Sequence, residues 1–88
     1  MTRALVQIRG RVQGIGFRYS ALSRARSLGV AGWVRNKPDG SVEAAFEGDD
    51  ERVRSMVEWC RRGPGGADVQ SIDVEWHEPT GDTDFRVR

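Results

Sequence analysis

The sequence contains few of the residues that build metal and disulfide sites. Among its 88 residues there is one cysteine, Cys60, and one histidine, His77. A single cysteine excludes an internal disulfide and is typical of a reducing compartment, so we expect a cytoplasmic protein. Without a cluster of cysteines and histidines, the chain lacks the usual ligands of a zinc site. We therefore expect a function that needs no metal and no other cofactor.

Long apolar runs are also absent. No stretch approaches the roughly 18 consecutive apolar residues of a membrane-spanning helix, so we expect no membrane partner. The first residues lead directly into a strand-like pattern, and we expect no signal peptide. A chain of this length allows one hydrophobic core, which predicts a single domain over residues 1–88. We expect this domain to be a monomer.

Acidic residues are missing from the first 38 positions. This segment holds eight basic residues and no aspartate or glutamate, whereas residues 39–88 hold all 13 acids and six arginines. The formal charges of the two segments are therefore +8 and −7. A positive field around the first segment would concentrate anionic ligands. Alternatively, the two segments interleave on folding and their fields largely cancel, and the sequence leaves both readings open.

The spacing of apolar residues predicts the order β-α-β-β-α-β followed by a short final strand. Gly29 ends the first helix, and the side chain of Asp49 caps the second helix. Pro38 and Gly40 mark a turn between the second and third strands. The expected strands cover residues 3–11 and 30–36 and the alternating sets Val42, Ala44, Phe46, then Ile72, Val74, Trp76, and finally Phe85, Val87. The expected helical core positions are Ala21, Leu22, Ala25 and Leu28 within residues 17–28, and Val53, Met56, Val57 and Cys60 in the second helix.

This order is typical of an α+β, ferredoxin-like βαββαβ sandwich: an open, mostly antiparallel sheet with two helices on one face and a short fifth strand. If the third strand lies between the first two, those two strands are parallel, and their carboxyl ends share one edge of the sheet. The first strand ends at a glycine-rich loop, and the second ends at Asn36. Ligands of open sheets tend to bind beyond such strand ends, so we expect the loop and Asn36 to form one site.

The glycine-rich loop is the strongest sign of a binding site. Glycines at positions 10, 14 and 16 stand between a strand pattern and a helix, where backbone N–H groups can converge on one point. Such a nest binds anions, and Arg18 adds a planar fork that suits phosphate oxygens. A tight turn with a surface arginine is the plainer reading, and the loop matches neither the Walker nor the dinucleotide pattern. The predicted phosphate-binding residues are Arg11, Val12, Gln13, Gly14, Ile15, Gly16, Phe17 and Arg18.

Two long motifs resemble those of the acylphosphatase family. Residues 8–18 read I-x-G-x-V-Q-G-I-x-F-R, and residues 32–48 contain G-W-V-R-N, then G-x-V, then a final glycine. The resemblance covers essentially the whole chain, and no position that the family uses for chemistry departs from its pattern. It implies that the chain is an acylphosphatase in which Arg18 binds phosphate and Asn36 orients the nucleophilic water.

The implied reaction is hydrolysis of the carboxyl–phosphate bond of an acyl phosphate to a carboxylate and inorganic phosphate. The carboxylate leaves as a stable anion and needs little help from a general acid, so charge stabilisation and in-line positioning dominate. The loop N–H groups and Arg18 can stabilise the phosphoryl group, while Asn36 can hold the water or contact the phosphoryl group. No protein nucleophile or metal is required. The expected partners are a small-molecule acyl phosphate and inorganic phosphate, the latter as product and inhibitor.

Two other classes of function remain open. The fold carries many unrelated functions, so the chain could be a non-catalytic phosphate-binding or regulatory module, like the acylphosphatase-like part of a larger maturation protein. The domain fills the whole chain, which favours a free-standing enzyme. RNA-binding sandwiches present aromatic residues on an exposed strand face, whereas the third strand offers Glu43, Ala45 and Glu47 there. We therefore expect no nucleic-acid partner.

Other residues have plain structural readings. Cys60 falls on the apolar face of the second helix, which favours a small core residue over a nucleophile. His77 follows a strand end and is expected to be solvated. Trp33 could line the acyl side of the site, but packing is the stronger reading. Gln13 and Ile15 are expected to shape the loop.

Overall fold

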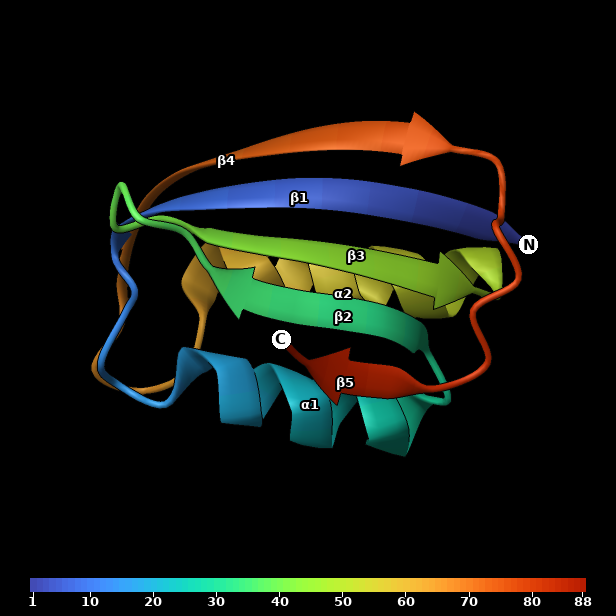
Figure 1. Cartoon of the computed structure of the whole chain (residues 1–88), viewed down its shortest axis with the longest axis horizontal. Coiled ribbons are helices and arrows are strands. Elements are labelled where there is room, and N and C mark those ends of the chain that lie inside the picture. Colours follow the sequence, from blue (N-terminus) through green and yellow to red (C-terminus); the bar gives the residue numbers. More distant parts are fainter.

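The computed structural model describes all 88 residues, and its five strands and two helices follow the expected order (Figure 1). The helix ends are as predicted: Gly29 adopts a left-handed conformation with φ 72°, and the Asp49 side chain accepts a hydrogen bond from the Arg52 N–H group. Neither helix is long and apolar enough to span a membrane. The elements are β1 (Thr2–Arg11), α1 (Phe17–Leu28), β2 (Ala31–Asn36), β3 (Val42–Gly48), α2 (Asp50–Arg62), β4 (Asp68–His77) and β5 (Phe85–Val87).

The sheet has the strand order β4-β1-β3-β2-β5, and both helices pack on one of its faces (Figure 1). Because β3 runs antiparallel to both β1 and β2, the latter two strands are parallel to each other. Their carboxyl ends lie at the same end of the sheet, on the left in Figure 1, together with the start of α1. We call this the loop end of the sheet; it comprises residues 10–18 and 36–42. The predicted ferredoxin-like fold is confirmed.

The core lies between the sheet and the helices. Ala4, Val6 and Ile8 alternate along β1 and are all fully buried, as the alternation of apolar residues in the sequence predicted. They share one cluster with Phe46 and Phe85, whose rings stack with their centroids 5.8 Å apart. Full burial of one such large side chain contributes about 1.5–3 kcal/mol relative to exposure, so this layer fixes the strands from which the loop emerges. The buried helix residues are Phe17, Ala21, Ala25, Val53, Met56, Val57 and Cys60.

Three expected apolar positions lie at the periphery of this core. Leu22 and Leu28 are only partly buried, although both pack against the cluster. Trp76 is 50% exposed. It belongs to β4, an edge strand with a neighbour on one side only, so strand alternation overstates its burial.

The outer face of β3 differs from the sequence expectation of an exposed strand surface. Glu43, Ala45 and Glu47 point away from the helices, but all three are buried, with exposed fractions of 9%, 0% and 2%. β3 is the central strand, and the side chains of Gln7 and Arg35 cover Glu43 through hydrogen bonds of 2.6 Å. The segment between β4 and β5 covers Glu47. No open strand surface is left here for stacking bases.

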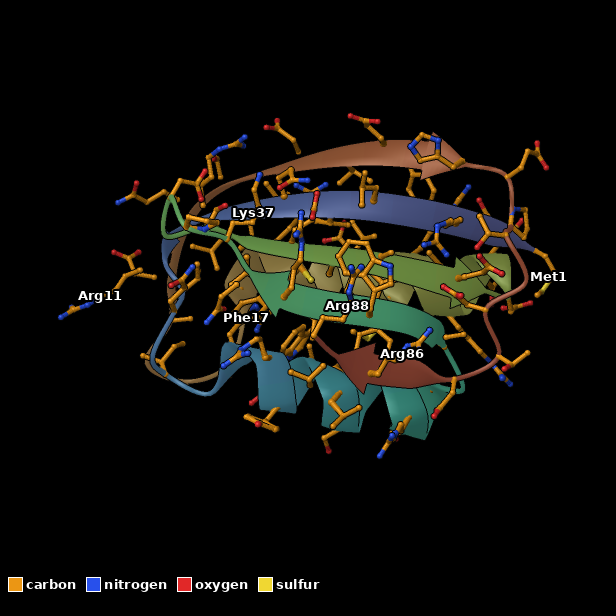
Figure 2. The ribbon with its side chains drawn as sticks, viewed as in Figure 1. Met1, Arg11, Phe17, Lys37, Arg86 and Arg88 are labelled. Carbon is orange, nitrogen blue, oxygen red and sulfur yellow. The ribbon has the colours of Figure 1, made fainter.

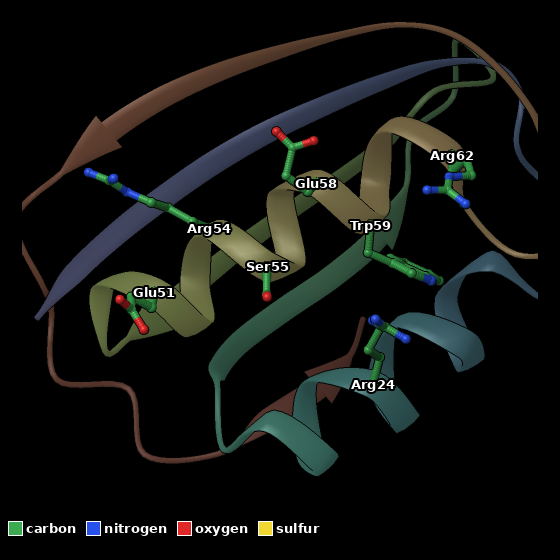
Figure 3. Close-up of a pocket in the computed structure, with 8 residues that line it drawn as sticks. Arg24, Glu51, Arg54, Ser55, Glu58, Trp59 and Arg62 are labelled. Carbon is green, nitrogen blue, oxygen red and sulfur yellow. The ribbon is translucent and has the colours of Figure 1, made fainter.

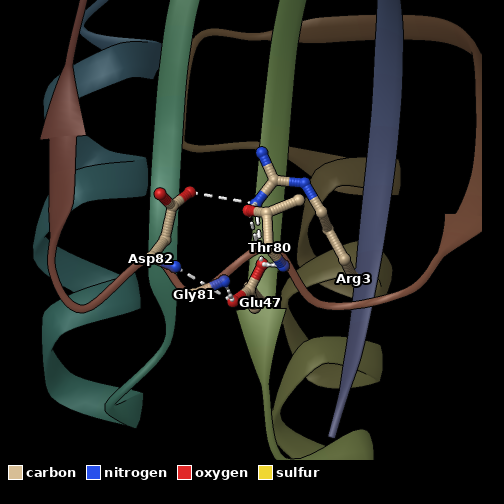
Figure 4. Close-up of polar contacts among 5 residues, drawn as sticks. All are labelled: Arg3, Glu47, Thr80, Gly81 and Asp82. Carbon is tan, nitrogen blue, oxygen red and sulfur yellow. Dashed lines mark hydrogen bonds and ion pairs between the residues drawn. The ribbon is translucent and has the colours of Figure 1, made fainter.

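Glu47 fastens that segment to the central strand, in an arrangement that we call the Glu47 clasp (Figure 4). Its carboxylate accepts hydrogen bonds from the N–H groups of Thr80 and Gly81 at 2.8 Å and of Asp82 at 3.1 Å. Arg3 Nη1 donates to Glu47 Oε1 at 2.8 Å. Burial alone would raise the pKa of this carboxyl, but the hydrogen bonds from Thr80 and Arg3 lower it to about 2. Because β4 and β5 lie at opposite edges, the clasp holds the crossing segment that brings β5 beside β2.

Candidate active site

The loop between β1 and α1 leaves backbone N–H groups without partners. Gly14 and Gly16 have φ angles of 77° and 80°, and no atom lies within 4 Å of a Cβ built at either position. Glycine reaches this left-handed region without steric cost. Gly16 caps α1 without a side-chain hydrogen bond, and the first turn contains no acidic residue. The N–H groups at the start of α1 are therefore free, which is the arrangement that binds anions.

Buried side chains anchor the loop to the core. Val12 and Phe17 are fully or almost fully buried, and the rings of Phe17 and Trp59 lie with their centroids 5.2 Å apart. Ile15 packs partly against the same core. Arg11 is exposed, and its side chain projects away from the molecule (Figure 2), so it makes no contact with the rest of the predicted phosphate site in this structure.

Arg18 lies in the first turn of α1 and is half-buried. Its Nη1 donates one long hydrogen bond, 3.4 Å, to the main-chain oxygen of Arg88. Its guanidinium carbon lies 6.0 Å from the ring centre of Tyr19, a side chain exposed to solvent. No aspartate or glutamate forms an ion pair with Arg18. Most of its five N–H donors are thus available to a ligand such as phosphate.

Asn36 is the last residue of β2 and pairs with Val42 across the β2–β3 turn. Strand alternation places it on the helix side of the sheet, like the buried Val34 and like the start of α1. Its side chain is half-buried, and the protein contains no buried side-chain polar atom without a partner. The Asn36 amide, which has no hydrogen bond within the protein, is therefore open to solvent. Arg18 and Asn36 share the loop end of the sheet.

Gln13 connects the loop to the turn that follows Asn36. Its Nε2 donates to the main-chain oxygens of Lys37 at 2.7 Å and Ser41 at 2.8 Å. From the sequence we expect only that Gln13 shapes the loop. Its two partners lie 24 and 28 positions later in the chain, and no local pattern marks them.

The opposite charges of the two sequence segments pair in part: four of the eight basic residues of 1–38 form ion pairs with acids of 39–88. The arginines of residues 1–38 that form ion pairs do so only with acids of residues 39–88. Arg11 and Arg18 of the loop have no such partner. The interleaving alternative therefore holds for the four paired basic residues. Positive charge without an acidic partner persists at the loop end, where it favours anionic ligands. The paired residues are Arg3 with Glu47 and Asp82, Arg9 with Asp73, Arg26 with Asp84, and Arg35 with Glu43.

Trp33 lies on the other face of the sheet. Strand alternation along β2 puts it opposite to Asn36. Two guanidinium carbons lie over its ring, that of Arg88 4.6 Å and that of Arg35 5.9 Å from the ring centre. These cation–π contacts give Trp33 a packing role. They do not support the alternative that Trp33 lines the acyl side of the site.

Cys60 and His77 lie away from the candidate site. Cys60 is fully buried in α2, and burial raises the pKa of its thiol to about 12, which removes it as a nucleophile at neutral pH. His77 is exposed, lies 3.2 Å from Glu75, and pairs with Arg3 at the end of the sheet opposite the loop end. No group of three or more histidine, cysteine, aspartate or glutamate residues is placed to hold one metal ion.

The largest surface hollow also lies elsewhere, between α1 and α2 (Figure 3). Arg24 and Arg62 approach Trp59 from the two helices, and no lining residue belongs to the loop or to the end of β2. A cradle of backbone N–H groups holds a small, charged phosphate without a deep cavity, so the size of a hollow does not locate such a site. The other lining residues are Glu51, Arg54, Ser55, Glu58 and Gly63.

The sequence model of the acylphosphatase family matches residues 4–87. The chain belongs to the acylphosphatase family. It is 54% identical over 85 residues to the acylphosphatase of Thermococcus kodakarensis, which covers 97% of this chain and 93% of that protein. It is 53% identical over 88 residues to the acylphosphatase of a Nostoc species, which covers 100% of this chain and 87% of that protein. At this identity and coverage the chain is an acylphosphatase, a hydrolase of acyl phosphates.

Solved acylphosphatase structures share the complete fold. The Bacillus subtilis acylphosphatase superposes with a TM-score of 0.96 at 35% identity, covering 100% of this chain and 99% of that one. The Coxiella burnetii acylphosphatase gives 0.94 at 36% identity, with 99% and 92% covered. Thermococcus kodakarensis HypF gives 0.85 at 27% identity, but the match spans 100% of this chain and only 12% of HypF. The chain thus corresponds to the whole of the acylphosphatases and to a small part of HypF.

Proposed function

We propose that this acylphosphatase hydrolyses its substrate at the loop end of the sheet. Arg18 and the N–H groups of residues 11–18 hold the phosphoryl group, and Asn36 positions the attacking water. One observation carries the assignment: two polar side chains lie at one end of the sheet beside an uncapped helix N-terminus. Arg18 has no aspartate or glutamate partner, and Asn36 has no hydrogen-bond partner in the protein. The substrate and its water supply the partners that these groups lack.

Binding of the phosphoryl group uses the loop backbone and one side chain. The N–H groups around Gly14 and Gly16 donate to the phosphoryl oxygens, and the positive end of the α1 dipole favours their charge. Arg18 adds two parallel N–H···O bonds from its planar fork. The loop contains no carboxylate that would repel the substrate. Donors fixed in advance stabilise the phosphoryl oxygens during transfer, where charge is spread over three of them.

The water then attacks phosphorus in line with the leaving carboxylate. The amide oxygen of Asn36 accepts a hydrogen bond from the water and fixes its direction of approach. The water oxygen bonds to phosphorus, the bond from phosphorus to the carboxyl oxygen breaks, and its electron pair leaves with the carboxylate. A proton of the water passes to the phosphate product or to solvent. Because a carboxylate is a stable anion, no general acid and no protein nucleophile take part.

Inorganic phosphate is proposed to act as product and competitive inhibitor, because it presents the same oxygens to the loop as the bound phosphoryl group does. The proposed mechanism uses no metal, and the loop carries no carboxylate, thiol or imidazole to ligate one. We also propose that residues 1–88 work as one domain. A cytoplasmic location and a monomeric state stay predictions.

Phosphate release from benzoyl phosphate by the purified protein tests the proposal. We expect turnover well above spontaneous hydrolysis, its loss in Arg18→Ala, and full activity in the presence of a chelator. Arg24→Ala is the matched control, because it removes the same charge from the same helix at a position outside the loop. Phosphate binding without turnover would instead support a non-catalytic phosphate-binding module.

A further inference from the structure

The side-chain amide of Gln13 spans the gap between the phosphate loop and the β2–β3 turn. Gln13 is half-buried and follows the fully buried Val12, so the core fixes the point from which its side chain reaches. Its Nε2 donates to Lys37 O at 2.7 Å and to Ser41 O at 2.8 Å. An amide nitrogen has two hydrogens, so these two bonds use its whole donor capacity.

The two acceptors form the neck of the turn. Ser41 O also accepts the Lys37 N–H at 2.8 Å, and Lys37 O also accepts the Gly40 N–H at 3.1 Å. Asn36 directly precedes this neck and pairs with Val42. Gln13 therefore hydrogen-bonds both strands of the neck, which begins one residue after Asn36.

No other side-chain hydrogen bond joins the phosphate loop to β2 and the turn that follows it. The loop carries the N–H groups that face the phosphoryl group, and β2 carries the Asn36 amide that faces the water. We propose that Gln13 is a positioning residue that fixes Asn36 relative to the phosphate loop. This inference rests on the proposed function.

A change at Gln13 should affect attack more than binding. Arg18 and the N–H groups of the loop remain when the Gln13 amide is removed, whereas the end of β2 loses its two hydrogen bonds to the loop. A misplacement of about 1 Å can cost about 10²-fold in rate, because in-line attack depends steeply on geometry. We expect Gln13→Met, which has nearly the same length and no donor, to lower kcat by about 10–100-fold. The inhibition constant of inorganic phosphate should change little.

A double-mutant cycle with Asn36→Ala isolates this role from a general effect on the loop. The experiment measures kcat with benzoyl phosphate and inhibition by inorganic phosphate for the parent, both single variants and the double variant. Once Asn36 is truncated, its placement no longer matters, so Gln13→Met should cost little further in that background. Equal fold-losses in both backgrounds, or a phosphate inhibition constant that rises as much as kcat falls, would overturn the proposal.

The cycle also separates the two proposals. If Asn36→Ala keeps the parent kcat, the proposed role of Asn36 is wrong. Any fall in kcat of Gln13→Met would then not arise from a displaced Asn36, and the inference would be overturned as well. If Asn36→Ala lowers kcat but the losses are additive, only the role of Gln13 is wrong.

Gln7→Met is a matched control, because Gln7, on β1, is also a glutamine that hydrogen-bonds the β2–β3 hairpin. Gln7 Nε2 donates to Glu43 Oε2 at 2.6 Å, and Gln7 Oε1 accepts from Lys37 Nζ at 3.2 Å, but both partners are side chains on the face away from the helices. Its replacement should lower the melting temperature and leave kcat close to the parent value. If Gln13→Met does not fold, Gln13→Asn keeps the donors but is too short to reach both oxygens, and the same non-additive loss of kcat is expected. A Gln13→Asn variant with parent kcat would contradict the role.

Discussion

The guanidinium of Arg18 donates to the main-chain oxygen of Arg88 at 3.4 Å, which links the first turn of α1 to the end of β5. The two residues are 70 positions apart, and β5 reaches this place because the Glu47 clasp holds the segment that crosses the sheet end. One long bond occupies one of five N–H donors. The bond to Arg88 thus orients the Arg18 guanidinium and leaves its other N–H donors available to a ligand.

Arg18→Lys should restore little of the activity that Arg18→Ala loses. Removal of a cationic clamp in phosphoryl transfer costs on the order of 10³–10⁵ in rate. Lysine keeps the charge but replaces a planar fork with a single ammonium group, and so loses the paired bonds to phosphate. Steady-state kinetics with benzoyl phosphate measure the effect. A lysine variant with most of the parent activity would show that the bidentate contact is unimportant.

Asn36→Ala should lower kcat by about 10²–10³, the usual loss for one preorganised hydrogen-bonding group. Inhibition by inorganic phosphate should change little, because the phosphate contacts are assigned to Arg18 and the loop. Product-inhibition kinetics give both values from one set of progress curves. Normal turnover combined with much weaker phosphate binding would move Asn36 from the water to the phosphoryl group.

Phosphate should raise the melting temperature of the parent through the loop. A ligand that binds only the folded state stabilises it by about 2.7 kcal/mol at about 100 times its Kd. Sulfate is expected to do the same, but it also strengthens burial generally. Thermal unfolding of the parent and of Arg18→Ala in equal concentrations of each salt separates the two effects. Equal stabilisation of both proteins would remove Arg18 from the phosphate site.

Without anion, Arg18→Ala should melt at or above the parent temperature. In the folded protein Arg18 makes one long hydrogen bond, to the main-chain oxygen of Arg88, and no ion pair with an aspartate or glutamate, so its removal costs little. Positions built for an external ligand often reduce stability. A clear fall in melting temperature in salt-free buffer would mean that Arg18 is a structural residue.

Glu47→Gln should lower the free energy of unfolding at pH 7 by about 3 kcal/mol. The pKa of Glu47 falls from an ordinary value of 4.5 to about 2 on folding, which corresponds to about 3 kcal/mol of stabilisation by the carboxylate. This stabilisation is complete above pH 4.5 and is lost as the pH falls toward 2, so the two proteins should converge in acid.

Urea unfolding at pH 7 and near pH 2.5 measures the Glu47 effect. Asp73→Asn is the control, because its ion pair with Arg9 is exposed and should contribute within about 0.5 kcal/mol. A stability difference between Glu47→Gln and the parent that is independent of pH would mean that the charge of Glu47 is not what holds the clasp.

Local patterns were sufficient to predict the elements. The alternation of Ala4, Val6 and Ile8 marked β1, Gly29 ended α1, and Asp49 capped α2, since each signal acts within a few residues of the chain. The glycine-rich loop and Asn36 were found in the same way, and topology brought them to one end of the sheet. Their catalytic roles stay predictions.

Contacts between distant residues could not be predicted. Glu43 and Glu47 look like an exposed acidic face until the neighbouring strands and the segment at residues 80–82 cover them. The partners of Gln13 and the neighbour of Arg18 likewise depend on which strands pair and on where β5 docks. The alternation of Ile72, Val74 and Trp76 predicted β4 correctly, but it could not show that β4 is an edge strand, on which Trp76 is 50% exposed.

Hydrolysis of benzoyl phosphate in ¹⁸O-labelled water tests the central claim most directly. Water held by Asn36 attacks phosphorus, so a single turnover at enzyme excess should place one labelled oxygen in inorganic phosphate and none in benzoate. The parent should give this pattern with a chelator present, and Asn36→Ala should give it more slowly. Label in benzoate would mean attack at the carbonyl carbon and would contradict the account.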